Sequence, residues 1–205
     1  MLNLSTGPTA LSTTVYQAIN KEIISHRSEE FSLIKNRIEK NLMRLAYSNA
    51  EPVIITTSGT GAIDSVFCTL LNNNKKILIV SCGFYGDLAY KIAVSYIANV
   101  YYLRFENGKG IREDIVNNYI NKHGDFDYIY FTHNESSTGV MNDIYNISNY
   151  IKKISSAKII VDCISSFGSC SIKFDNLPID IMIASTQKGL MSLPCLLYTS
   201  DAADE

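Results

Sequence analysis

The chain has 205 residues, of which 46% are hydrophobic and 19% charged, and its formal net charge is −2. This composition is typical of a globular protein that forms one sizeable core or most of a larger domain. A charge so close to zero gives no reason to expect nucleic acid or an anionic membrane as a partner. No segment has the roughly 18 uninterrupted apolar residues of a membrane span, and the N-terminus lacks the basic and apolar regions of a secretion signal.

Two helices are predicted in the first fifty residues. The first spans about 12–25 and is capped by Ser12 or Thr13. Ser28 opens the second, because two glutamates and then a helical repeat of apolar residues follow it. The repeat consists of Phe31, Ile34, Ile38, Leu42 and Leu45.

From residue 53 onward, short apolar runs alternate with stretches of helical length. The runs lie at 53–56, 77–80, 99–103, 128–131, 159–161 and 179–184. The helical stretches lie at 60–72, 84–98, 111–123 and 142–154. Such alternation predicts a three-layer α/β fold, with a mostly parallel sheet covered by helices on both faces. No repeat or linker interrupts it, so residues 1–194 are expected to be one incomplete folding unit.

The last eleven residues differ from the rest of the chain. Residues 195–205 resemble a translated sequencing adapter, and they end in an acidic segment where another apolar strand would be expected. We therefore expect 195–205 to be a non-native tail and 1–194 to be the N-terminal part of a longer protein.

The segment 57–61, Thr-Ser-Gly-Thr-Gly, follows the first apolar run and precedes a helix. Glycines let backbone N–H groups approach a phosphate, and a helix N-terminus adds unpaired donors and a positive dipole end. The alternative is an ordinary strand-to-helix turn. The segment does not match either of two nucleotide-binding motifs. The Gly-Lys-Ser/Thr of a P-loop is missing, and Asp64 stands where a dinucleotide fingerprint needs its third glycine.

Asp162 and Lys188 also follow apolar runs. Because ligands in open α/β sheets gather beyond the carboxyl ends of the strands, one crevice would collect both with Ser58. A carboxylate there would keep the pyridine nitrogen of pyridoxal phosphate protonated, and an amine would bind the cofactor covalently. Taken singly, Asp162 is more typical of a helix N-cap, and Lys188 of a solvated surface charge.

Two further segments offer groups to the same cofactor. Tyr85 would lay its ring on a cofactor face, or else belong to the core. Segment 133–139, His-Asn-Glu-Ser-Ser-Thr-Gly, supplies hydroxyls and an amide for a ring oxygen or a phosphate. His133 itself is more typical of a structural hydrogen-bonding residue than of a catalyst. An amine, a carboxylate and an anion-binding turn at strand ends are together the protein groups that pyridoxal phosphate requires.

In this order, the motifs resemble the class V aminotransferases, which belong to the fold-type I pyridoxal phosphate enzymes. The resemblance covers essentially all of 1–194, and it is specific as a set. The matching segments are 5–8, 26–28, 57–61, 83–86, 133–139, 162–168 and 185–188. The nearest resemblance is to alanine/serine–glyoxylate (or pyruvate) aminotransferases and to 2-aminoethylphosphonate–pyruvate aminotransferase.

The resemblance implies a role for each matching position. Lys188 forms the Schiff base, Asp162 pairs with the pyridinium nitrogen, and Tyr85 stacks on the ring. Ile164 packs on the opposite ring face and Ser136 bonds the phenolic oxygen. The remaining implied positions are the phosphate-binding Ser58, Gly59, Thr60 and Gln187, and Gly7 in the substrate loop.

The implied reaction is a ping-pong transamination through a Lys188 aldimine. A small donor of the alanine or serine type passes its amino group to a 2-oxo acid such as pyruvate or glyoxylate. Members of the family form homodimers, and a C-terminal small domain supplies the arginine that binds the substrate carboxylate. That region is missing here, so the chain itself is expected to be inactive or weakly active. No metal ligand set is expected.

Three alternatives stay open at this point. The first is 2-aminoethylphosphonate as the donor, and the second is a non-catalytic phosphate-binding α/β module. The third, a cysteine desulfurase, is disfavoured because those enzymes typically carry His where Tyr85 stands and His where Gln187 stands.

The five cysteines show neither a Cys-x-x-Cys pair nor the spacing of a metal site. They are Cys68, Cys82, Cys163, Cys170 and Cys195. We interpret them as small buried residues in a reducing compartment, and so expect a cytoplasmic protein.

Overall fold

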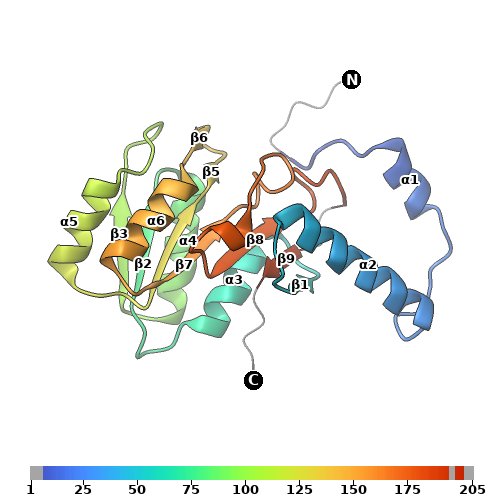
Figure 1. Cartoon of the computed structure of the whole chain (residues 1–205), viewed down its shortest axis with the longest axis horizontal. Helices are drawn as coiled ribbons and strands as arrows, with labels where there is room; N and C mark the ends of the chain where they lie inside the picture. Colours follow the sequence, from blue (N-terminus) through green and yellow to red (C-terminus); the bar gives the residue numbers. More distant parts are fainter. Residues whose placement is uncertain (1–6, 194–196, 201–205) are drawn as a thin grey trace.

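A central seven-stranded sheet organises the computed structural model, which describes residues 7–193 and 197–200 (Figure 1). The strand order is β1-β9-β8-β7-β4-β2-β3. Five neighbouring strands, from β8 to β3, run parallel, whereas β9 is antiparallel to both of its neighbours. The strands are β1 (Pro52–Ile55), β2 (Ile77–Ser81), β3 (Val100–Arg104), β4 (Tyr128–Thr132), β7 (Lys158–Asp162), β8 (Ile181–Ser185) and β9 (Leu197–Ser200). The expected α/β class with a mostly parallel sheet is confirmed.

Helices cover both faces of this sheet, because the strands are apolar on both sides. Leu78 and Val80 of β2 pack on one face, in the core that includes α5 and α6. Ile77 and Ile79 point to the other face, beneath α3 and α4. The helices are α1 (Thr13–Ile19), α2 (Glu29–Ala46), α3 (Gly59–Leu70), α4 (Phe84–Tyr96), α5 (Glu113–His123) and α6 (Ile144–Ile154).

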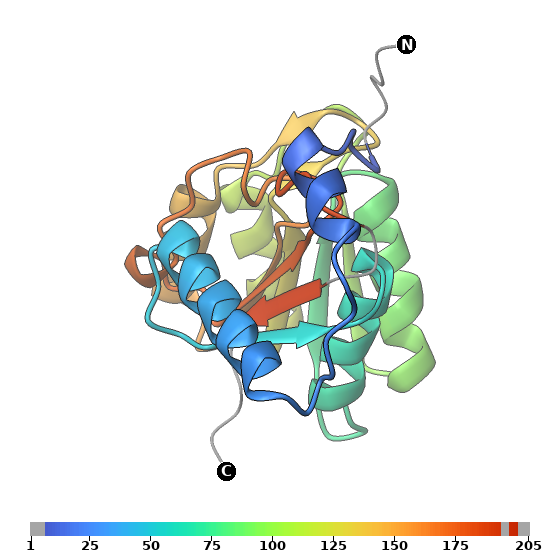
Figure 2. The same cartoon turned by 90° about the vertical axis from the view of Figure 1, so that its right-hand side faces the viewer.

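The N-terminal helices lie at the β1–β9 end of the molecule, opposite α5 (Figures 1 and 2). Ser12 and Ser28 cap α1 and α2, each accepting a backbone N–H three residues on. The predicted first helix is too long, since α1 ends at Ile19 and none of its residues is buried. A short helix without packing partners gains too little to extend further.

Two small elements were not predicted from the sequence. A hairpin formed by β5 (Asn134–Glu135) and β6 (Val140–Met141) stands beside the sheet. A 3₁₀ turn, η1, spans Phe174–Asn176. Strands of two residues carry too little periodicity to be recognised in a sequence.

The segment 195–205 contains a strand that the sequence analysis did not expect. Residues 197–200 form β9, which pairs with β1 on one side and β8 on the other. Its backbone groups therefore complete the sheet between these two strands. The other residues of this segment, and residues 5 and 6 of the first matching motif, lie outside the described part of the chain. Within the described part, no helix combines the length and the apolarity needed to cross a membrane.

Candidate active site

A cavity of about 220 Å³ lies at the carboxyl ends of the parallel strands, where open α/β sheets bind ligands. All ten residues to which the sequence analysis assigned a site role line it. They are Gly7, Ser58, Gly59, Thr60, Tyr85, Ser136, Asp162, Ile164, Gln187 and Lys188. Segments separated by up to 181 residues in sequence, from Gly7 to Lys188, thus meet around one small space.

The N-terminus of α3 forms one wall of the cavity. Ser58 caps the helix, and its Oγ accepts the N–H of Gly61 at 3.1 Å. The preceding N–H groups, of Gly59 and Thr60, have no acceptor within the helix. A Cβ atom on Gly59 would come within 2.9 Å of Cδ1 of Ile164, so a side chain there would displace the opposite wall. This wall therefore presents backbone donors and a positive dipole end, which suit a phosphate.

Asp162 ends β7 and is 6% exposed. Burial raises the pKa of its carboxyl to about 6, while hydrogen bonds from Ile164 N–H (2.8 Å) and the Tyr130 hydroxyl (3.1 Å) act in the opposite sense. The negative charge of Glu135 raises this pKa as well, and the positive charge of Lys188 lowers it. The charged form of this buried carboxyl group is stabilised by any cation that enters the cavity, such as a protonated ring nitrogen.

Lys188 lies in the turn that follows β8, and its side chain is half-buried. Burial lowers the pKa of its ammonium group, and the charge of Asp162 partly offsets this effect. The N-terminal segment crosses this turn, because Thr9 donates its N–H to Gln187 O at 3.0 Å. A Cβ atom on Gly7 would lie 2.8 Å from Nζ of Lys188, so the N-terminal loop touches the amine.

Tyr85 and Ser136 approach the cavity from two different elements. Tyr85 lies in the first turn of α4, with its ring edge-on to Phe84 at 5.3 Å between centroids. Ser136 follows β5 in the turn of the small hairpin. The two segments are joined by Ser137, whose Oγ accepts the N–H of Phe84 at 2.9 Å.

Three further residues line the cavity without having been singled out from the sequence: Ile63, Asn134 and Ser165. Asn134 donates through Nδ2 to Ser165 Oγ at 2.9 Å, and Ser165 Oγ lies 3.0 Å from Asn134 O. Both polar residues belong to motifs that the sequence analysis noted, so position within those motifs was the available signal. His133, by contrast, is 4% exposed and lies outside the cavity lining.

The lining suits pyridoxal phosphate in chemistry as well as in position. It combines a helix N-terminus for a phosphate, a buried acid, an amine with a lowered pKa and an aromatic side chain. The sequence of residues 2–194 matches the model of the family described as Aminotransferase class-V. The chain belongs to the class V aminotransferase family. Class V aminotransferases are enzymes that depend on pyridoxal phosphate.

Curated proteins resemble the chain along most of its length. It is 30% identical over 197 residues to a 2-aminoethylphosphonate–pyruvate transaminase of Bacteroides fragilis, covering 94% of this chain and 54% of that protein. It is also 30% identical over 196 residues to the soluble hydrogenase 42 kDa subunit of Anabaena cylindrica, covering 95% and 51%. The chain thus spans about half the length of the curated relatives it matches.

A solved aminotransferase structure supports the fold in particular. The ureidoglycine–glyoxylate aminotransferase of Bacillus subtilis superposes with a TM-score of 0.90 at 24% identity, and the match covers 96% of this chain and 50% of that one. At this identity the likeness concerns the fold alone. It agrees with a large domain that makes up about half of an aminotransferase.

Proposed function

We propose that residues 1–194 are the large domain of a pyridoxal phosphate-dependent aminotransferase. Its reaction moves an amino group from a small donor of the alanine or serine type to a 2-oxo acid such as pyruvate or glyoxylate. The observation that carries the proposal is the single cavity in which the Lys188 amine and the Asp162 carboxylate lie beside the N-terminus of α3. Family membership supports it independently.

In this proposal, the walls of the cavity hold the cofactor in one orientation. Ser58, Gly59 and Thr60 bind its phosphate at the helix N-terminus, together with Gln187. Tyr85 and Ile164 flank its ring, and Ser136 bonds the ring oxygen. When bound, pyridoxal phosphate supplies an electron-poor ring over which charge from the donor carbon spreads.

Asp162 and Lys188 supply the proton chemistry. The buried carboxylate of Asp162 holds the proton on the ring nitrogen through a charge-assisted hydrogen bond, worth about 1.5–3 kcal/mol. Lys188 would hold the cofactor covalently, and its Nζ, when free, would move a proton at the donor carbon. The lowered pKa of Lys188 increases the neutral fraction of the amine, which is the form that both tasks require. Gly7 leaves space for the substrate beside this amine.

A second candidate donor is 2-aminoethylphosphonate. The similarity of the chain to the Bacteroides fragilis transaminase that is named for this compound supports it. In both versions the chemistry at Lys188 and Asp162 is the same, and only the recognition of the donor differs. Comparing turnover of alanine and 2-aminoethylphosphonate, with pyruvate as acceptor, in the longer protein that contains this sequence decides between them.

Borohydride trapping tests the proposed function directly. Pyridoxal phosphate is added to the purified chain, borohydride reduces any carbon–nitrogen double bond, and peptide mapping locates the adduct. We expect one adduct, on Lys188. The adduct is lost in Lys188→Ala, and it is retained in the control Lys153→Ala, where the substituted residue lies outside the cavity. Labelling scattered over many lysines would favour a phosphate-binding module without catalysis.

The proposal includes a homodimer in the cytoplasm. Eight large apolar side chains between residues 16 and 47 are exposed, and α1 and α2 carry most of them at one end of the molecule (Figure 2). A second copy would cover such a surface. The cysteines of the described residues are free thiols, in keeping with a reducing compartment. Light scattering of the longer protein that contains this sequence tests the dimer, and a monomeric mass at micromolar concentration would contradict it.

A further inference from the structure

Glu135 is a fully buried acid that does not itself line the cavity. It ends β5, directly before Ser136. Within residues 7–193, it takes part in none of the ion pairs that the structure contains. Burying a carboxylate is costly unless hydrogen bonds replace its water, so its donors indicate what the residue is for.

Four donors surround this carboxylate, and they come from two segments of the chain. From α4, the N–H of Tyr85 lies 3.2 and 3.3 Å from the two oxygens, and the N–H of Gly86 donates at 3.1 Å. From the hairpin turn, Ser137 donates its N–H at 3.2 Å and its hydroxyl at 2.6 Å. The first segment carries Tyr85 and the second carries Ser136, which face the same cavity.

The junction between the start of α4 and the hairpin turn is tightly packed at Gly83. A Cβ atom on Gly83 would lie 2.6 Å from Cδ of Glu135 and 2.6 Å from Oγ of Ser137, so only glycine fits between α4 and the hairpin. The N–H groups of Tyr85 and Gly86 belong to the first turn of α4, where no carbonyl within the helix accepts them. Glu135 is therefore the acceptor that these two amides need.

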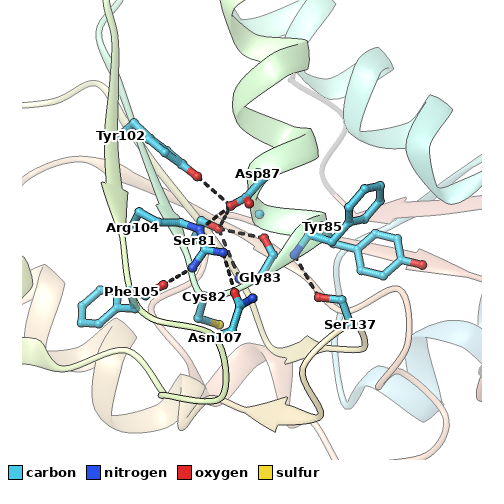
Figure 3. Close-up of polar contacts among 12 residues, drawn as sticks. Ser81, Cys82, Gly83, Tyr85, Asp87, Tyr102, Arg104, Phe105, Asn107 and Ser137 are labelled. Atoms are coloured by element: carbon cyan, nitrogen blue, oxygen red, sulfur yellow. Dashed lines mark hydrogen bonds and ion pairs between the residues drawn. The ribbon is translucent and has the colours of Figure 1, made fainter.

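A second cluster fixes the same turn to the sheet from the opposite side. Asp87 accepts the hydroxyls of Ser81 and Tyr102, the latter at 2.7 Å, and pairs with Arg104 Nε at 2.9 Å. Figure 3 shows this cluster on one side of the turn and Ser137 on the other. With α4 fixed to β2 and β3 in this way, Glu135 holds the hairpin in position against α4, together with the bond from Phe84 N–H to Ser137 Oγ.

We propose that Glu135 is a positioning residue that sets the spacing between Tyr85 and Ser136, and thereby the fit of the pyridoxal ring against Tyr85 and of its ring oxygen against Ser136. This inference rests on the proposed function. Glu135 acts through the backbone of Tyr85 and through Ser137, and it does not touch the cofactor. Its negative charge matches the positive end of α4, so a neutral amide of the same size is not equivalent.

The substitution Glu135→Gln keeps the volume and replaces one acceptor oxygen with a donor. The matched control is Asp143→Asn, an acid-to-amide change at the N-cap of α6, whose residues do not line the cavity. Amide hydrogen exchange of the cofactor-free chain reports the junction itself. We expect faster exchange at Tyr85 and Gly86 in Glu135→Gln, with no change at Asp87, whose N–H donates to Gly83 O within the helix.

Titration with pyridoxal phosphate, followed by visible circular dichroism, reports the fit of the ring. We expect the dissociation constant of Glu135→Gln to rise about tenfold and its visible signal to change, while Asp143→Asn matches wild type. Unchanged exchange at both amides would overturn the inference. Faster exchange with unchanged affinity and signal would also overturn it, because Glu135 would then have only a structural role.

Ser137→Ala provides the second test, and it decides the matter if Glu135→Gln does not fold. This variant keeps the carboxylate and removes the hydroxyl that links Glu135 to Phe84 N–H. We expect a weaker effect in the same direction, about threefold in affinity. An unchanged affinity would count against the inference. Failure of the wild-type chain to bind pyridoxal phosphate would instead overturn the proposed function, and with it the inference, whatever the amides of Tyr85 and Gly86 show.

Discussion

Asp162 ends β7, Lys188 follows the neighbouring parallel strand β8, and their side chains line the same cavity. Burial acts on them in opposite senses, since it raises the pKa of the Asp162 carboxyl to about 6 and lowers the pKa of the Lys188 ammonium. Each charge partly offsets the effect of burial on the other. An acid and an amine perturbed in this way within one cavity are typical of a functional site.

The first prediction concerns the stability of the cofactor-free chain. Because the pKa of Asp162 is higher in the folded state than the ordinary value of 3.8, the folded state binds the proton more tightly. The contribution of Asp162 to stability is therefore most favourable below pH 4, falls as the pH rises from about 4 to 6, and stays lower above that range. The raised pKa of Asp162 corresponds to a loss of about 3 kcal/mol in the free energy of unfolding at pH 8, relative to low pH.

Asp162→Asn removes this pH-dependent cost, because the amide oxygen still accepts the N–H of Ile164. We expect the variant to be more stable than wild type at pH 8 and to lose that advantage near pH 4. Urea unfolding at the two pH values measures the difference, and Asp143→Asn controls for the loss of one charge. In the active protein, the same variant binds the cofactor but turns over the donor at least about 100-fold more slowly.

The second prediction tests the coupling between the two residues. The charge of Asp162 raises the pKa of Lys188, so Asp162→Asn lowers that pKa further. The rate at which acetic anhydride labels Lys188, followed over a range of pH by peptide mapping, gives the midpoint for wild type and variant. A midpoint that stays in place or moves upward in the variant would show that the two side chains do not interact.

Ser58, Asp162 and Lys188 could be placed at one edge of the sheet because each lies where the local pattern of the sequence changes, whereas the roles of Gly7, Ile164 and Gln187 were implied only by the family resemblance. Asp162 ends an apolar run, Ser58 begins a helix, and Lys188 follows the last buried parallel strand. In a parallel sheet such positions converge on one edge whatever their separation in sequence. The alternation of runs and helices likewise predicted the order of the elements.

Glu135 and β9 could not be predicted in the same way. The donors to Glu135 include the N–H of Tyr85, 50 residues earlier, and backbone donors leave no trace in a sequence. The strand β9 pairs with β1, whose residues precede it by almost 150 positions, and its sequence has no alternation of apolar and polar residues. Both features are fixed by tertiary contacts and not by local pattern.

The third prediction separates the capping role of Ser58 from its role in the cavity. Ser58→Ala removes the acceptor of Gly61 N–H and lowers the free energy of unfolding by about 1 kcal/mol. Ser28→Ala, which removes the equivalent bond to Phe31 N–H in α2, has a similar effect on stability. Only Ser58→Ala also weakens binding of pyridoxal phosphate, by about tenfold. Equal affinities in the two variants would remove Ser58 from the phosphate site.

The fourth prediction concerns Gly7 and the amine beside it. In Gly7→Ala, the new Cβ would lie within 3 Å of the last carbons and Nζ of Lys188, so this flexible side chain must move away. We expect the yield of borohydride-trapped adduct on Lys188 to fall about tenfold, with a loss of stability of about 1–3 kcal/mol from the strained backbone.

The control for Gly7→Ala is Gly108→Ala. Gly108 also has a positive φ, of +83°, but a Cβ there has no neighbour within 4 Å, so the variant carries the backbone strain without the contact. We expect this variant to give the wild-type yield of adduct. If both variants lose the adduct equally, or if Gly7→Ala keeps it, the N-terminal loop does not hold Lys188 in its reactive position, and Gly7 has no part in the site.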